Sequence, residues 1–157
     1  MIILMSGAVF LDRDGVLIQN VATYVRAWSD VNFIPGALAA LACLSSTSIK
    51  IVIVTNQSVV GRGIISIREA QEINERLVAE IIEVGGRIDG LFMCPHVPED
   101  RCLCRKPQPG LLLQAADKFS IDLPRSILIG DAISDIQAGQ AADVGVNVLV
   151  KTGRGEQ

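Results

Sequence analysis

AVFLDRDGVL, residues 8–17, begins as an unbroken apolar run and breaks at two carboxylates that flank one arginine. Such a run is typical of a strand covered on both faces of a parallel sheet. Similar runs follow at 49–55, 88–94, 126–131 and 144–150. Helical patterns lie between them, at 35–46, 66–86, 109–119 and 134–142, and Ser66 with Glu69 gives the second a capping box. This alternation predicts an α/β fold, a Rossmann-like three-layer sandwich with a central parallel sheet.

Length and composition indicate a single globular domain over residues 1–157, because half of the residues are apolar and no repeat or linker interrupts the chain. The formal net charge of −3 gives no general attraction for nucleic acid or an anionic membrane, so we expect neither as a partner. The opening MIILMSGAVFL has no basic segment and is too short to span a bilayer. We therefore expect a disordered start, then a buried strand, in a cytoplasmic protein.

Polar side chains follow three of the predicted strands at the point where each strand ends. Asp12 and Asp14 follow the first, residues 55–58 (TNQS) end the second, and Asp131 and Asp135 follow the fourth. Each aspartate alone is also a good helix N-cap, which is the common role at such a position. Ligands of open parallel sheets bind at the carboxyl ends of the strands, and converging carboxylates need a cation. Together these residues predict a Mg²⁺ site with room for a phosphate.

Four motifs in this order resemble those of the haloacid dehalogenase-like (HAD) superfamily: FLDRDGVL, IVTNQS, the lysine of CRKP, and IGDAISDIQAG. The CPHxP…CxCRKP segment is similar to the branch that contains the heptose-bisphosphate and histidinol-phosphate phosphatases. The chain departs from that branch at Val59-Val60 and at Ala132, which bears on substrate preference.

The resemblance implies a phosphatase in which Asp12 is the nucleophile, forming an aspartyl phosphate, and Asp14 is the general acid and base. The Asp12 carboxylate, the Asp14 carbonyl and Asp131 would bind Mg²⁺, with Asp135 supporting them.

Residues of the second and third motifs are expected to contact the phosphate and the rest of the substrate. Thr55 and the amide of Asn56 would cradle the phosphate, Gln57 would contact the substrate, and Lys106 would supply a fixed positive charge. Arg62 and Arg105 are candidates for a second phosphate or a carboxylate. A solvated surface role is the alternative for Lys106 and Arg62.

Cys94, His96, Cys102 and Cys104 supply the Cys₃His donor set of a structural zinc site. A disulfide is disfavoured, because three clustered cysteines leave one unpaired and we expect a reducing compartment. Four protein ligands leave no open position, so we expect Zn²⁺ to shape the loop that carries Arg105 and Lys106. Cys43, alone in a helical apolar pattern, is predicted to be a small core residue.

The predicted function is Mg²⁺-dependent hydrolysis of a small phosphorylated metabolite, which the resemblance narrows to the C7 phosphate of D-glycero-D-manno-heptose 1,7-bisphosphate. Histidinol phosphate is the alternative substrate, and a noncatalytic zinc-stabilised binding module is the alternative of another class. The segments at 15–35 and 94–110 are too short for a large cap domain, so we expect an open site and a monomer.

Overall fold

The computed structural model describes residues 6–156, in which five parallel strands form one sheet in the order β3-β2-β1-β4-β5. The predicted disordered start lies outside these residues. The strands are β1 (Ala8–Leu11), β2 (Lys50–Asn56), β3 (Gly90–Cys94), β4 (Ile127–Gly130) and β5 (Val146–Leu149). The helices are α1 (Ala37–Leu44), α2 (Ser58–Gly61), α3 (Ile67–Glu83), α4 (Gly110–Phe119) and α5 (Ile133–Ala141), with three 3₁₀ turns, Trp28–Asp30, Pro98–Asp100 and Leu123–Arg125.

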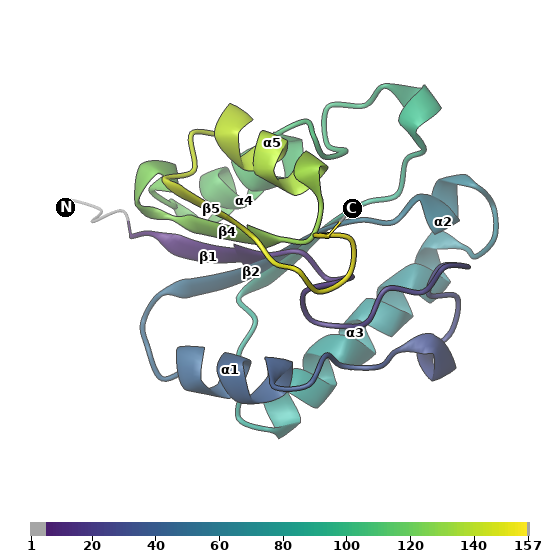
Figure 1. The fold of residues 1–157 in the computed structure, drawn as a ribbon, viewed down its shortest axis with the longest axis horizontal. Coiled ribbons are helices and arrows are strands. Elements are labelled where there is room, and N and C mark those ends of the chain that lie inside the picture. The colour runs from purple at the N-terminus through teal and green to yellow at the C-terminus, as the bar shows by residue number, and fades with distance from the viewer. Residues whose placement is uncertain (1–5, 157) are drawn as a thin grey trace.

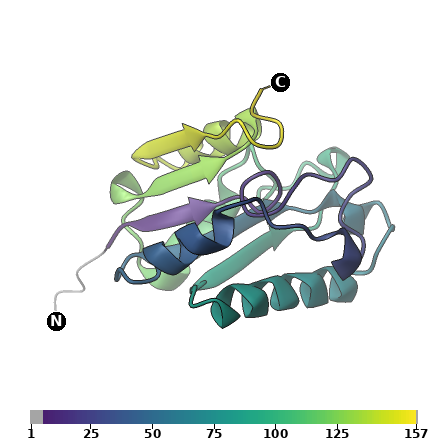
Figure 2. The ribbon, with the colours of Figure 1, turned by 60° about the horizontal axis from the view of Figure 1, so that its bottom comes forward.

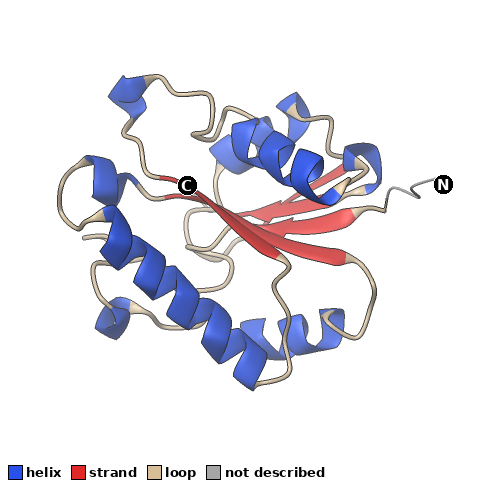
Figure 3. Cartoon of the chain, turned by 180° about the vertical axis from the view of Figure 1, so that it is seen from behind, coloured by secondary structure: helices blue, strands red, loops and turns tan. Residues whose placement is uncertain are grey.

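Helices cover both faces of the sheet, which confirms the predicted three layers (Figures 1 and 3). Side chains of a strand alternate between its faces, and β2 shows this clearly. Ile51 and Ile53 pack with α3 on one face, whereas Val52 and Val54 pack with α4 on the other. Each face therefore buries its own apolar cluster, and the sheet is held rigid between the two.

The elements begin and end close to the predicted residues, for local reasons that the sequence carries. Ser66 Oγ accepts the Glu69 backbone N–H (3.2 Å), and the Glu69 carboxylate accepts the Ser66 backbone N–H (2.7 Å), so the predicted capping box is present. Gly85, with φ of 86°, follows the end of α3 and supplies the left-handed conformation that side chains disfavour.

Three details of the fold differ from the predictions. The short helix α2 was not predicted, because four residues carry no helical period. Cys43 is exposed, not in the core, since it lies two positions beyond the buried Leu41 and so on the opposite side of α1. Strand β5 is an edge strand and Val146 is exposed, so this run is not covered on both faces.

The order of the strands sets the position of the site. The chain proceeds outward from β1 through β2 to β3, and then returns to the other side of β1 with β4 and β5. Ligands of such sheets bind where the order reverses, at the carboxyl ends of the two neighbouring strands from which the chain continues in opposite directions. Here those strands are β1 and β4, and the arrowheads in Figure 2 all point to the end where the long loops gather.

The described chain contains no large cap domain, as predicted: the segment between β1 and α1 holds a single 3₁₀ turn, and so does the segment between β3 and α4. Among residues 6–156, none of the helices has both the length and the apolar character needed to cross a membrane.

Candidate active site

A cleft of about 810 Å³ opens at the carboxyl end of the sheet, and its walls come from segments far apart in the sequence. The loop after β1, the end of β2, the segment before α4, the start of α5 and the residues after β5 all contribute. Thr55 and the cysteine–histidine cluster are the predicted site residues outside these walls. The predicted residues in the walls are Asp12, Asp14, Asn56, Gln57, Arg62, Arg105, Lys106, Asp131 and Asp135.

Lys106 lies at the centre of a buried ion network and not on the surface. Its Nζ lies 2.9 Å from Oδ1 of Asp12 and 2.6 Å from Oδ1 of Asp135, and it donates a hydrogen bond to the Val54 carbonyl (2.8 Å). The lysine is 3% exposed and Asp135 is 1% exposed. The two carboxylates raise the pKa of Lys106 against the effect of its burial. The ammonium is therefore a fixed positive charge beside Asp12.

Asp131 is the carboxylate most available to a metal ion. Its Oδ2 accepts hydrogen bonds from the Asn20 side chain (2.7 Å) and from the Arg154 backbone N–H (2.9 Å). Its Oδ1 is fully buried without a hydrogen-bond partner among the described residues. An unsatisfied buried carboxylate oxygen is costly, so a cation that it can ligate would stabilise this arrangement.

The chemistry of the donors fits a hard divalent cation. Oxygens of Asp12, Asp131 and Asp135 lie within 4.8 Å of one another, and the Lys106 ammonium pairs with two of these carboxylates, Asp12 and Asp135. Both oxygens of Asp135 are already engaged, one by Lys106 and the other by the backbone N–H groups of Asp131 and Ala132. Asp12 and Asp131 are therefore the better direct ligands, and Asp135 holds the lysine and the start of α5. Oxygen donors of this kind suit Mg²⁺.

Burial raises the pKa of Asp12 to about 7, and the Lys106 ammonium limits that rise. The carboxylates of Asp135 and Asp14 act in the same direction as burial. A bound cation favours the ionised carboxylate, which is the form a nucleophile requires.

Asn56 fixes the backbone of Lys106 and does not point freely at the cleft. Its Nδ2 donates to the Lys106 carbonyl (3.0 Å), and its Oδ1 accepts the Lys106 backbone N–H (3.1 Å). Thr55, one residue earlier, is fully buried, and its hydroxyl has no hydrogen-bond partner among the described residues. The two predicted phosphate contacts thus differ: one side chain is fully paired, and the other is unpaired behind the cleft wall.

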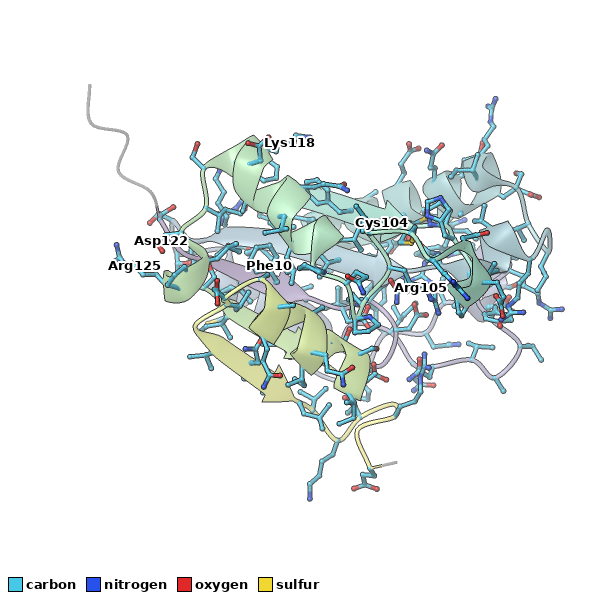
Figure 4. All side chains as sticks on the ribbon, turned by 90° about the horizontal axis from the view of Figure 1, so that it is seen from above. Phe10, Cys104, Arg105, Lys118, Asp122 and Arg125 are labelled. Carbon is cyan, nitrogen blue, oxygen red and sulfur yellow. The ribbon has the colours of Figure 1, made fainter. Side chains whose placement is uncertain are left out.

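Two predicted arginines lie on the side of the cleft that is nearest to the cysteine–histidine cluster. Arg62, at the end of α2, is exposed in the wall, as is usual for a residue that meets a ligand from solution. Arg105 donates from Nη1 to the carbonyl of His96 (3.1 Å), so the loop itself orients the guanidinium. Figure 4 shows Arg105 beside Cys104, at the opposite end of the molecule from Asp122 and Arg125.

Several residues that shape the cleft were not identified from the sequence. Arg13 is buried and binds Asp14, and the buried Asn74 of α3 bridges Arg13 and Gln57. Asn74 carries a detectable signal, because it is a polar residue within the apolar face of an amphipathic helix. Asn20 and Arg154 carry none, since their roles depend on loops that only the folded chain brings to Asp131.

The cysteine–histidine cluster is assembled as the sequence predicts. Sulfur–sulfur distances among Cys94, Cys102 and Cys104 are 3.2, 3.5 and 3.6 Å, and Nδ1 of His96 lies 3.5 and 3.3 Å from Cys94 and Cys104. A tetrahedron with Zn–S bonds of about 2.3 Å has edges of roughly 3.7 Å, so these donors lie close to the required spacing. Burial opposes ionisation of all three thiols and raises the pKa of Cys94 to about 12 and that of Cys104, whereas at Cys102 the Arg105 backbone N–H helps to lower the pKa to about 7.

Comparisons with known proteins agree with this geometry. A model of the HAD-hydrolase-like family matches residues 103–157. A D-glycero-beta-D-manno-heptose-1,7-bisphosphate 7-phosphatase of Photorhabdus laumondii is 40% identical over 154 residues, covering 94% of this chain and 81% of the relative. The chain belongs to the HAD-like phosphatase family. The predicted superfamily and the predicted enzyme class, a phosphatase, are confirmed.

Further relatives of this HAD-like phosphatase extend the agreement to three dimensions. The enzyme of the same name from Haemophilus influenzae is 39% identical over 96% of this chain and 84% of its own. The crystal structure of D,D-heptose 1,7-bisphosphate phosphatase from B. bronchiseptica, complexed with magnesium and phosphate, matches with a TM-score of 0.89 and 36% identity. That match covers 96% of this chain and 83% of the other.

Proposed function

We propose that this HAD-like phosphatase removes the C7 phosphate of D-glycero-D-manno-heptose 1,7-bisphosphate, acting as a single domain over residues 1–157. The observation that carries the proposal is the buried centre at the switch point of the sheet. Asp12 lies 2.9 Å from the Lys106 ammonium there, and Asp131 keeps one unpaired buried oxygen. The relatives from Photorhabdus laumondii and Haemophilus influenzae bear the name of a phosphatase for this sugar, with the beta configuration.

Asp12 is proposed as the nucleophile that attacks phosphorus. Its Oδ1 accepts the Arg13 backbone N–H (2.8 Å) and contacts Lys106, so the carboxylate is held in one orientation. The bond from Asp12 to phosphorus forms while the bond to the sugar oxygen breaks, and Asp14 gives that oxygen a proton. Asp14 then takes a proton from the water that hydrolyses the aspartyl phosphate. Thr55 lies outside the cleft walls, so its proposed contact with the phosphate rests only on its unpaired hydroxyl.

Mg²⁺ is the proposed catalytic cofactor, held by Asp12, the Asp14 carbonyl and Asp131. When bound, it would neutralise charge on the phosphate and favour the ionised form of Asp12. The unpaired Oδ1 of Asp131 supports this assignment, as does the magnesium complexed with the B. bronchiseptica enzyme. Asp135 is proposed to act through Lys106.

Zn²⁺ is proposed to be held by Cys94, His96, Cys102 and Cys104, without a role in the chemistry. These ligands precede Arg105 and Lys106 directly, so the ion would fix the segment that delivers both cations. Arg62 and Arg105 are the proposed contacts for the phosphate that is not cleaved. Location in the cytoplasm and a monomeric state stay predictions.

Phosphate release by the purified protein with Mg²⁺ tests the proposal, with Asp12→Asn as the blank. The substrates are the alpha and beta anomers of heptose 1,7-bisphosphate and histidinol phosphate. We expect the beta anomer to be preferred over both by about 100-fold or more in kcat/KM, equivalent to roughly 2.7 kcal/mol of transition-state discrimination. A preference for histidinol phosphate would move the assignment to the histidinol-phosphate phosphatases of the same branch. Release no faster than the blank for all three would refute the proposal.

A further inference from the structure

Arg13 forks its guanidinium onto Asp14, and its own side chain is only 3% exposed. Nε donates to Oδ2 of Asp14 (3.0 Å), and Nη2 donates to Oδ1 (3.1 Å). Both carboxylate oxygens are therefore held by one planar group. Both residues line the cleft, but the Asp14 side chain is 20% exposed and the Arg13 side chain only 3%, so the aspartate is the more accessible of the two.

The guanidinium is itself held from behind. Its Nη1 donates to Oδ1 of Asn74 (2.8 Å), a side chain of α3 that is 4% exposed. The Asn74 amide lies 2.7 Å from the Gln57 amide, beyond the end of β2. A guanidinium offers its donors in a rigid plane, so a bond on the far side fixes the orientation of the fork. Asp14 is thereby tied to the longest helix of the described chain through two side chains.

This arrangement is more than the neutralisation of one buried charge needs. A single contact with Asp14 would compensate the charge of Arg13, but it would leave the carboxyl free to rotate. Here the fork fixes the plane of the carboxyl, and Asn74 fixes the plane of the fork. Proton transfer depends on such placement, because a general acid must lie within hydrogen-bond reach of the departing oxygen.

We propose that Arg13, anchored by Asn74, is the positioning residue that orients Asp14 for proton transfer. The inference rests on the proposed function, in which Asp14 protonates the leaving sugar oxygen as its bond to phosphorus breaks. In this proposal Arg13 acts through Asp14 and does not itself carry the transferred proton.

Dependence on the leaving group distinguishes positioning of an acid from general support of the fold. An alkyl phosphate needs a proton on its departing oxygen, whereas p-nitrophenyl phosphate releases a stable phenolate without one. The measurement is kcat/KM for both substrates with Mg²⁺, because this ratio reports the steps up to the first irreversible one. The variants are Arg13→Lys and Asn74→Ala, with Asp14→Asn as the reference for loss of the acid.

We expect Asp14→Asn to lose on the order of 100-fold or more with the alkyl phosphate and far less with p-nitrophenyl phosphate. Arg13→Lys keeps the charge but not the forked contact. We expect its kcat/KM to fall about 30-fold with the alkyl phosphate and about 3-fold with p-nitrophenyl phosphate. We expect Asn74→Ala also to lower kcat/KM more for the alkyl phosphate than for p-nitrophenyl phosphate, but with a smaller difference between the two. Asn74→Asp keeps an acceptor for Nη1 of Arg13, and we expect it to restore most of the lost kcat/KM.

Arg87→Lys is the matched control, because Arg87 also binds a nearby carboxylate, Asp89 (3.2 Å), and the Ile49 carbonyl (2.7 Å). These groups lie at the amino end of β2, away from the cleft. We expect Arg87→Lys to lower the melting temperature and to leave the ratio of the kcat/KM values for the two substrates unchanged.

The outcomes separate the inference from the proposed function. If Asp14→Asn affects both substrates equally, the assignment of Asp14 as the acid fails. If Asp14→Asn shows the difference but Arg13→Lys and Asn74→Ala slow both substrates equally, the positioning role is overturned and Arg13 is structural. Should Arg13→Lys not fold, the pair Asn74→Ala and Asn74→Asp decides by the same criterion.

Discussion

Replacing Lys106 by Met tests the buried ion network most severely. The ammonium has three close partners: Asp12 at 2.9 Å, Asp135 at 2.6 Å and the Val54 carbonyl at 2.8 Å. Met fills a similar volume but leaves two carboxylates facing one another without a cation. Removing one partner of a buried ion pair costs about 3–5 kcal/mol. For a chain of this size, each kcal/mol lowers the melting temperature by about 2–4 °C, so a fall of about 6–20 °C is expected.

The loss of stability should depend on pH, with a sign that the Asp12 carboxyl determines. Burial raises the pKa of Asp12 to about 7, and Lys106 limits the rise, so the pKa rises further without the lysine. The folded variant then binds more protons than the unfolded chain from about pH 4 up to that pKa. Its stability therefore increases as the pH falls from 8 toward 5, by up to about 1.4 kcal/mol per pH unit.

The assay is thermal unfolding at pH 8 and pH 5 in a chelating buffer, so that no divalent ion replaces the missing charge. Lys118→Met is the control, because Lys118 is exposed on α4 and contacts aromatic rings instead of carboxylates. We expect the control to change stability by less than about 1 kcal/mol at either pH. A melting temperature for Lys106→Met within the range of the control, at both pH values, would refute the ion network.

Three further perturbations follow from the same geometry. Asp12 must be ionised to bind Mg²⁺, and its pKa is raised to about 7. The apparent Mg²⁺ affinity should therefore rise about tenfold per pH unit from pH 5 to 7 and level off above pH 7. A calorimetric affinity that does not depend on pH would contradict this. Asn56→Ala removes both hydrogen bonds to the Lys106 backbone. We expect kcat to fall about 10- to 100-fold, equivalent to about 1–3 kcal/mol. Unchanged turnover of p-nitrophenyl phosphate would count against a role of these bonds in placing the lysine. Cys102→Ser should lower both the melting temperature and the amount of bound zinc, measured by elemental analysis. Cys43→Ser, at an exposed site, should change neither. Equal zinc content in the two variants would exclude the assigned cluster.

The sequence allowed the sheet to be predicted because its signal is local. Most of the strands are apolar runs, and after β1 and β4 the residue that ends the run, Asp12 or Asp131, marks the carboxyl edge of the sheet. The ligands of the proposed zinc site were equally accessible, since all four lie within eleven residues and sulfur and imidazole have few other reasons to cluster.

The parts of the site that were missed depend on tertiary packing. The bond of Asn56 to the Lys106 backbone joins positions fifty residues apart, and the contact of Arg154 with Asp131 joins loops that follow different strands. No local pattern encodes these pairs. Asn74 is the exception, because an asparagine on the buried face of a helix requires partners and so predicts a polar cluster beneath it.

The central claim is that Asp12 carries the phosphoryl group during turnover. Asp14→Asn, given p-nitrophenyl phosphate and Mg²⁺, should form the aspartyl phosphate but hydrolyse it slowly, because the base that activates water is missing. Rapid acid quenching followed by peptide mass analysis would then detect the phosphoryl group. The account predicts that the peptide containing Asp12 gains the mass of one phosphoryl group and that the Asp12→Asn/Asp14→Asn double variant gains none. Turnover by Asp12→Asn, or a phosphoryl group found on a different peptide, would contradict it.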